Sequence, residues 1–387
     1  MQKEKKSPYA EDGVSVSLGD KLSAYAGELC EQTFGNSEYI WVRDFSKGFF
    51  RGPKSFEPIS LPPGTTFDLS PDGARTKTII TDAAMKHHFS ARDWLAMCSG
   101  DIMRWGGKPI LFINDLNVSS LGENEESETY QAARRLLHGL KTTCDDLGYV
   151  MYKGETAEMG PCVSSGNINA TLKYIWSGTA FGLLNPRNMI TGKGLAVGQS
   201  IMALYDDGFG ANGGSSVRKA FELKFGGNWY AREDAQRYIR MAAEPCTLYD
   251  KFLTNINGWD SADLQPLIKS YLNVHLTGGS FKGKFFEDIL LRYGFSAELD
   301  SLFDPPEIVS LCGEWRGLSP TEFYETFAGG QRVLSVIDNR DIKKYIQIAK
   351  KFKLKAKKCG KIVKNDSPRL AIHSKFKTNE VIVLEKK

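Results

Sequence analysis

The sequence has few of the features that mark secreted, zinc-ribbon or membrane proteins. Its seven cysteines are scattered, odd in number and never spaced as a CxxC pair. That usage argues against a disulfide framework and a zinc ribbon, and it favours a reducing compartment. No apolar run approaches the roughly 20 residues that cross a bilayer, and no apolar stretch follows the charged residues near the N-terminus. We therefore expect no membrane contact, no signal peptide and a cytoplasmic location.

A strong charge of one sign is also missing. The net charge is +4, with 41% apolar and 25% charged residues, which is ordinary for a globular protein. We therefore expect no nucleic-acid partner. The lysine-rich segment 350–364 has two interpretations, a basic patch or a solvated helix end that runs into a strand. Apolar residues such as Phe352, Ile362 and Val363 punctuate it, which favours the second interpretation.

The length of 387 residues allows two or three domains. Apolar periodicity and turn residues predict the main elements. We expect helices at 20–34, 91–105, 123–147, 217–223, 245–257 and 341–352, strands at 110–116, 148–152, 198–205 and 332–337, and a strand pair at 168–181. The turn residues Asn185 to Asn188 mark the expected domain boundary.

Two carboxylates stand close together after the apolar strand 148–152. Glu155 and Glu158 lie in the segment 153–160, which has a glycine before the first acid and another after the second. We expect this segment to be a loop. Glycine lets backbone approach a ligand closely, and Mg²⁺ is usually held by one or two protein carboxylates plus phosphate oxygens. For Glu158 a purely local cap or pair is the stronger alternative.

The helix expected at 91–105 carries an acid on its apolar face. Asp101 recurs with Trp94, Met97 and Trp105 at helical spacing. A carboxylate on a buried face needs a partner, so Asp101 is either a paired core residue or a ligand. Asp93 has the position of a helix N-cap. His87 and His88 lie in a polar turn, where we expect them at the surface.

Two glycine-rich loops follow strands in the second half. The first, 206–216, precedes a helix, so its backbone N–H groups and the helix dipole could hold an anion, or it is a plain tight turn. Its spacing matches neither the P-loop nor the dinucleotide fingerprint. In the second loop His275 stands between a strand and the pair Gly278-Gly279. A lone histidine is more often structural, but the glycines raise the odds that it faces a pocket.

Taken together, these segments resemble one family, aminoimidazole ribonucleotide synthetase, the phosphoribosylformylglycinamidine cyclo-ligase of purine biosynthesis. The resemblance runs from about Tyr9 to Ile372. Its motifs are Tyr9…Gly13-Val14, Asp72-Gly73-x-x-Thr76-Lys77, Asp93-x-Leu95-Ala96-Met97-Cys98-x-x-Asp101, Gly154-Glu155-Thr156-Ala157-Glu158-Met159, Asn212-Gly213-x-Ser215-x-Val217-Arg218-Lys219 and His275-Leu276-Thr277-Gly278-Gly279.

The resemblance implies an α+β fold of two domains. Residues 1–182 would form an ATP- and metal-binding domain whose mixed sheet builds a barrel-like interface in a homodimer. Residues 183–387 would form an α/β sandwich. It also implies an ATP-dependent ligase that phosphorylates the formyl amide oxygen of its ribonucleotide substrate and then closes the ring.

The same resemblance assigns roles to individual residues. Mg²⁺ would bind Asp72, Asp101 and Glu155. Catalytic roles fall to Lys77, which would neutralise phosphate, to Glu155, and to His275, which would contact substrate or move a proton. The remaining nucleotide or phosphate contacts would come from Gly73, Thr76, Asp93, Asn212, Gly213 and Ser215.

The chain departs from the family pattern inside its glycine loops. Arg75, Gly100, Gly210, Ala328 and Arg332 stand where the family has Gly, Asn, His, Asn and Gly, and Gly160-Pro161 reverses a Pro-Gly pair. Arg75 and Arg332 could bind phosphate in a new way, or they could fill a site that is no longer used. Two alternatives therefore stay open, a related ATP-dependent enzyme with another substrate and a non-catalytic nucleotide-binding dimer.

Overall fold

The computed structural model describes residues 15–46 and 52–386. The motif Tyr9…Gly13-Val14 lies outside these residues. The chain divides into two compact units. The first consists of the described residues up to Leu61 together with Leu69–Cys98 and Ile110–Phe181, and the second of Pro62–Asp68, Ser99–Pro109 and Gly182 onward. Two short segments of the N-terminal half, one of which contains Asp101, thus belong to the second unit.

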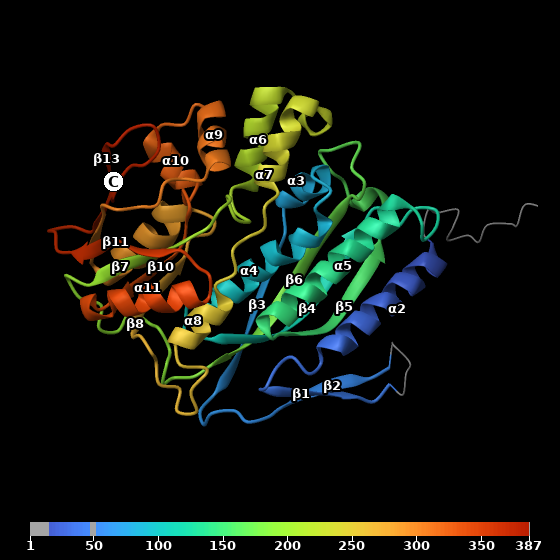
Figure 1. Cartoon of the computed structure of the whole chain (residues 1–387), viewed down its shortest axis with the longest axis horizontal. Coiled ribbons are helices and arrows are strands. Elements are labelled where there is room, and N and C mark those ends of the chain that lie inside the picture. The colour runs from blue at the N-terminus through green and yellow to red at the C-terminus, as the bar shows by residue number, and fades with distance from the viewer. Residues whose placement is uncertain (1–14, 47–51, 387) are drawn as a thin grey trace, which may run out of the picture. The chain divides into compact units, whose positions relative to one another are not determined.

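The first unit contains two sheets and their covering helices (Figure 1). A hairpin of β1 (Ile40–Asp44) and β2 (Lys54–Pro58) accompanies a four-stranded sheet of order β3-β6-β4-β5. Those strands are β3 (Thr66–Gly73), β6 (Tyr174–Leu184), β4 (Lys108–Val118) and β5 (Val150–Glu158), and the helical elements are α2 (Val16–Thr33), α3 (Lys77–Ala83), η1 (His87–Phe89), α4 (Ser90–Met103), α5 (Glu128–Leu147) and η2 (Gly160–Cys162). Local signals bound α5, because the Ser127 hydroxyl accepts from the Tyr130 N–H and Gly148 ends the helix at φ 78°.

Among residues 15–46 and 52–386, helices cover one face of the four-stranded sheet (Figure 1). On that face Trp94 of α4 packs edge-on against Trp176 of β6 and Phe112 of β4, with ring centroids 5.6 and 5.8 Å apart. The opposite face keeps large apolar side chains in solvent, since Leu69, Ile113 and Ile175 are 61%, 41% and 52% exposed. This alternation along the strands is typical of a sheet with one face packed on the core.

The second unit is built on a seven-stranded sheet of order β13-β12-β9-β11-β7-β10-β8. The strands are β7 (Ser200–Tyr205), β8 (Ser270–His275), β9 (Ser296–Leu299), β10 (Gln331–Ile337), β11 (Ala356–Val363), β12 (Arg369–His373) and β13 (Val381–Glu385). The helical elements are α6 (Gly214–Phe225), η3 (Trp229–Ala231), η4 (Glu233–Ala235), α7 (Gln236–Ala242), α8 (Asp250–Ile256), η5 (Phe281–Leu291), α9 (Glu307–Trp315), α10 (Pro320–Thr326), η6 (Asn339–Asp341) and α11 (Ile342–Lys351). Every residue of β10 is buried, and Phe252 of α8 meets Tyr345 of α11 in the core beside it.

The expected α+β class is confirmed, and so are most elements. The lysine-rich segment is a helix end followed by a strand, since α11 ends at Lys351 and β11 begins at Ala356. In the described part of the chain no helix is long and apolar enough to cross a membrane.

Two local predictions were wrong. The acidic segment 153–158 belongs to strand β5, and 168–181 contributes one strand, β6, instead of two. The glycines and polar residues of these segments suggest loops, but pairing with neighbouring strands overrides that local preference.

The packing of α5 predicts an unusual response to a helix substitution. Gly139→Ala normally favours a helix, but here the added Cβ would lie 2.2 Å from the backbone oxygen of His88. We expect this variant to lower the free energy of unfolding by about 1–3 kcal/mol, as overpacking does. Urea denaturation measures the change.

The matched control is Gly19→Ala in α2, where nothing lies within 4 Å of the new Cβ. That variant should raise the free energy of unfolding by about 0.4–1 kcal/mol. Equal effects of the two substitutions would contradict the packing described for α5.

Candidate functional site

Asp72 and Arg75 form an ion pair at the C-terminal end of β3. The Arg75 Nε and Nη2 atoms both lie 3.0 Å from Asp72 Oδ1, which also accepts the Gly73 N–H at 2.7 Å. The Asp72 side chain is 11% exposed and that of Arg75 is 74% exposed. The residue that departs from the family pattern therefore contacts the carboxylate expected to bind the metal ion.

A hollow of about 540 Å³ opens beside this pair on the uncovered face of the sheet. Asp72, Gly73 and Arg75 line one side of it, Ile113 and Asp115 of β4 another, and Ser177 and Thr179 of β6 its floor. Asp115, a second acid, was missed by the sequence analysis. The polar pair Asn114-Asp115 interrupting an apolar strand was the signal that could have found it.

Glu155 lies on the next strand, away from Asp72. It stands beside Asp115 in the parallel register of β4 and β5. Strands β6 and β4 separate Asp72 from Glu155, and three strand spacings of about 4.8 Å amount to roughly 14 Å. Because Mg²⁺ holds oxygen ligands at about 2.1 Å, one ion cannot contact both carboxylates within one chain.

No metal-binding group of three or more His, Cys, Asp or Glu side chains occurs among residues 15–46 and 52–386. The predicted set of Asp72, Asp101 and Glu155 is therefore not assembled as one cluster in this chain. Glu155 instead lines a separate hollow of about 310 Å³ with Lys54, Lys153 and Gly154. Asp72 and Asp115 are the two acids that line the hollow of about 540 Å³, and they stand on β3 and β4 with β6 between them.

Asp101 is not on a buried face, contrary to the prediction. Its side chain is 46% exposed and its Oδ1 lies 3.7 Å from Arg104 Nη1, one helical turn further along. The helix α4 ends at Met103, so Asp101 occupies its last turn, where the apolar periodicity no longer reports burial.

Lys77 and Asp93 form a buried ion pair. Lys77 Nζ lies 2.9 Å from Asp93 Oδ1 and neither side chain is exposed to solvent. Asp93 is therefore not simply a helix cap, and Lys77 contacts an acid of α4 instead of lining the hollow at Asp72. Thr76, its neighbour, lines a second hollow of about 340 Å³ with Arg75, Thr78, Ser164 and Ser165.

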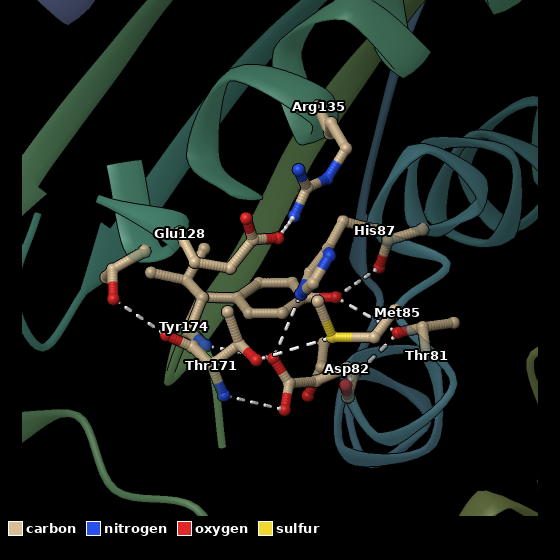
Figure 2. Close-up of polar contacts among 12 residues, drawn as sticks. Thr81, Asp82, Met85, His87, Glu128, Arg135, Thr171 and Tyr174 are labelled. Carbon is tan, nitrogen blue, oxygen red and sulfur yellow. Dashed lines mark hydrogen bonds and ion pairs between the residues drawn. The ribbon is translucent and has the colours of Figure 1, made fainter. Parts of the chain in front are cut away.

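His87 is completely buried, so the prediction of a surface histidine was wrong. Its Nε2 lies 2.9 Å from Asp82 Oδ1, and the same carboxylate accepts the backbone N–H groups of Thr171 and Leu172 (Figure 2). Beside it the Tyr174 hydroxyl meets Thr81 Oγ1 at 3.0 Å. This network joins α3 and η1 to the start of β6, and thereby fixes one wall of the hollow that Thr76 lines.

Glu158 has a structural role, as expected, but its partners are 37 and 143 residues away in the sequence and are not the local ones that the alternative supposed. Its two carboxylate oxygens accept the backbone N–H groups of Leu121 and Ser15, both at 2.7 Å. Ser15 is the N-cap residue of α2. Glu158 therefore ties the start of α2 and the turn after β4 to the end of β5.

In the second unit His275 packs against Gly100. His275 ends β8 and is 5% exposed, and a Cβ on Gly100 would lie 2.1 Å from its Nδ1 atom. The loss of the family's asparagine at position 100 thus makes room for the imidazole. Burial, followed by the nearby Arg332, Arg104 and Lys284, holds the pKa of His275 well below its usual value.

Arg332 occupies the space beside the other altered glycine. A Cβ on Gly210, whose φ is +69°, would lie 2.5 Å from the Arg332 guanidinium. Arg332 is 2% exposed and its Nε lies 3.9 Å from Asp206 Oδ2. The arginine thus stands where the family histidine would project. Asn212, Gly213 and Ser215 surround the start of α6, with Gly213 at φ +80°.

Solved structures define the class of protein to which this fold is similar. It matches thiamine-monophosphate kinase from Stenotrophomonas maltophilia K279a, with TM-score 0.59, 13% identity and coverage of 89% of this chain and 94% of that one. It also matches the hydrogenase maturation protein HypE in complex with ATP, with TM-score 0.56, 11% identity and coverage of 84% and 87%. PurL of T. maritima complexed with FGAR gives TM-score 0.53 and 10% identity, covering 96% of this chain but 53% of that one. At these identities the likeness shows the fold alone.

Sequence comparison gives a more specific likeness than the fold does. Residues 59–184 match the family described as AIR synthase related protein, N-terminal domain. Phosphoribosylformylglycinamidine cyclo-ligase of Staphylococcus saprophyticus is 27% identical over 320 residues, which are 79% of this chain and 86% of that protein. The same enzyme of Alkaliphilus metalliredigens is 26% identical over 365 residues, 93% and 96% of the two chains. The chain is similar to these cyclo-ligases over most of its length.

The depressed pKa of His275 predicts a pH effect on stability. The unfolded chain takes up a proton below the ordinary value of 6.5 while the folded imidazole stays neutral, so stability is complete above that pH and falls below it. Between about pH 7.5 and about pH 5.5 this group should cost roughly 1 kcal/mol. Urea unfolding of the protein and of His275→Asn at both pH values measures it. An equal response of both proteins would refute the assignment.

Proposed function

We propose that this chain is an ATP-dependent phosphoribosylformylglycinamidine cyclo-ligase. The proposal is carried by the hollow on the open sheet face, which brings two carboxylates and a guanidinium to one place. Acids that bind a divalent ion, together with a cation, are what the phosphates of a nucleotide require. The sequence likeness to cyclo-ligases over most of the chain indicates which reaction the site performs.

In this reaction the γ-phosphoryl group of ATP moves to the formyl amide oxygen of the substrate. An amidine nitrogen then attacks the activated carbon, the C–O bond breaks and phosphate leaves with its oxygen, which closes the ring. Phosphoryl transfer depends mainly on positioning and charge neutralisation. Mg²⁺, when bound, would neutralise phosphate charge, and Asp115 is the carboxylate of the hollow that would hold it, because Arg75 already neutralises Asp72.

The other predicted residues support this chemistry in different ways. We assign Lys77 a positioning role, because its buried contact with Asp93 fixes α3 against α4 behind the hollow. Burial and neighbouring cations hold the pKa of His275 well below its usual value, so we assign its neutral imidazole a hydrogen-bonding contact with the substrate instead of proton uptake. The loop of Asn212, Gly213 and Ser215 would receive the phosphate group of the substrate at the start of α6. Glu155 would take part in catalysis from the separate hollow of about 310 Å³ that it lines on β5.

We further propose that the open sheet face is the dimer interface. Leu69, Ile113 and Ile175 are all exposed on it, and exposed apolar patches of this kind mark interaction surfaces. A second copy of the same sheet would bury them and complete the barrel-like arrangement that the family resemblance implies. The acid-lined hollow shares this face, so the partner would also close the site from solvent.

The catalytic proposal is tested by ADP release in the presence of ATP, Mg²⁺ and formylglycinamidine ribonucleotide. We expect release that depends on the ribonucleotide, and a loss of about a hundredfold or more in kcat for Asp115→Asn, because a charge that acts on the transferring group is removed. The control Asp234→Asn changes an acid of the second unit that is paired with Arg232 at the surface and should leave the rate unchanged. Absence of ribonucleotide-dependent ADP release would reject the proposal.

The dimer proposal is tested by sedimentation velocity. Ile175→Glu places a charge at the centre of the open face and should convert dimer to monomer while circular dichroism stays unchanged. The control Val383→Glu alters an equally exposed apolar residue on β13 of the second unit and should stay dimeric. A wild-type monomer, or a dimer that tolerates Ile175→Glu, would show that this face is not the interface.

A further inference from the structure

Arg75 adopts a backbone conformation that arginine rarely takes. Its φ is 45°, in the left-handed region that favours glycine, and the related family has glycine at this position. A side chain in this conformation is strained and persists only where its surroundings hold it. The contact with Asp72 is the interaction that holds Arg75, since both Nε and Nη2 lie 3.0 Å from Oδ1. The substitution therefore introduced a cation at a defined place, at the cost of backbone strain.

The Arg75 guanidinium also has N–H groups that its contact with Asp72 does not use. Arginine carries five N–H groups, and the two nitrogens bonded to Asp72 use one edge of the group. The side chain is 74% exposed and lines two neighbouring hollows. One hollow contains the acid Asp115, and the other is lined by Thr76, Ser164 and Ser165. Arginine and hydroxyl donors together are a common arrangement for phosphate oxygens.

The positive group that pairs with the Asp72 carboxylate determines what contacts the phosphates of a bound nucleotide. A guanidinium at 3.0 Å already neutralises this carboxylate and repels a divalent cation from it. In a chain with glycine at position 75 the same carboxylate would need a metal ion as its counter-charge. Arginine and metal ion thus compete for the same oxygen, and both offer positive charge to the phosphates.

We infer that Arg75 is a specificity-determining residue that replaces part of the divalent cation's role at Asp72 and binds the phosphate chain directly. This inference rests on the proposed function, because the ligand is the nucleotide of that reaction. Its consequence is that nucleotide affinity in this protein depends less on Mg²⁺ than it would with the family's glycine.

Calorimetric titration with ADP tests the inference on the full-length protein, with excess Mg²⁺ and with a chelator. In the wild type we expect the two Kd values to agree within about tenfold. In Arg75→Gly, binding without metal should weaken by about tenfold to a hundredfold, the worth of a charged hydrogen bond, while binding with Mg²⁺ is largely retained. Arg75→Lys keeps the charge without the planar fork and should fall between them.

The control is Arg232→Gly, which removes an exposed arginine paired with Asp234 in the second unit and should change neither Kd. A second readout needs no nucleotide. Mg²⁺ should raise the Tm of Arg75→Gly more than that of the wild type, and the added substitution Asp72→Asn should abolish the gain.

Each result separates this inference from the proposed function. If the wild type binds ADP only with Mg²⁺, or if Arg75→Gly leaves the metal dependence unchanged, Arg75 does not replace the cation, whatever the ligase assay shows. If metal-independent binding is lost in Arg75→Gly but no ribonucleotide-dependent turnover exists, the inference holds and the reaction assignment fails. If no ADP binds under either condition, both are overturned.

Discussion

The first unit depends on a sheet that is packed on one face and open on the other. Trp94, Phe112 and Trp176 fill the covered face, which fixes the register of β4 and β6. Because side chains alternate along a strand, this packing forces their neighbours Ile113, Ile175 and Ser177 onto the opposite face. The same alternation places Asp115 on the open face, because it is two residues beyond Ile113 on the same strand. The position of the proposed site is thus a consequence of how the core is packed.

The departures from the family pattern occur as compensated exchanges. The His275 ring occupies the space that a side chain at Gly100 would need, and the Arg332 guanidinium occupies the space that a side chain at Gly210 would need. Arg75 accepts a strained backbone and gains a carboxylate partner. At Gly210 and Arg332, the volume and polar group lost at one position reappear at the neighbouring one, as close packing requires. Such exchanges indicate a site that has been rebuilt around new residues.

The sequence predicted the class of the fold, most helices and strands, and the structural role of Glu158. Periodicity succeeds for long amphipathic segments such as α5, where burial and helix spacing agree. Prediction from periodicity failed where tertiary contacts determine the local structure. Strand pairing extended β5 through a segment that looks like a loop, and the buried Asp82 partner of His87 was invisible in a polar stretch.

Site residues were harder to predict than elements, because motifs name residues but not their neighbours. Asp72 was identified, yet its contact with Arg75 depends on the backbone conformation of the local turn, and the presence of Asp115 in the same hollow depends on strand order. The separation of Asp72 from Glu155 by two strands follows from the order β3-β6-β4-β5, which no single-chain pattern reveals. Lys77 kept its motif position, but its ion pair with Asp93 buries it.

The central claim is that the nucleotide occupies the open sheet face of the first unit. Amide hydrogen exchange, followed with and without ADP and Mg²⁺, tests it most directly. The account predicts slowed exchange in segments 69–76 and 113–117, with segment 206–216 unchanged. Protection confined to the glycine-rich loop 206–216, with none around Asp72 and Asp115, would contradict it.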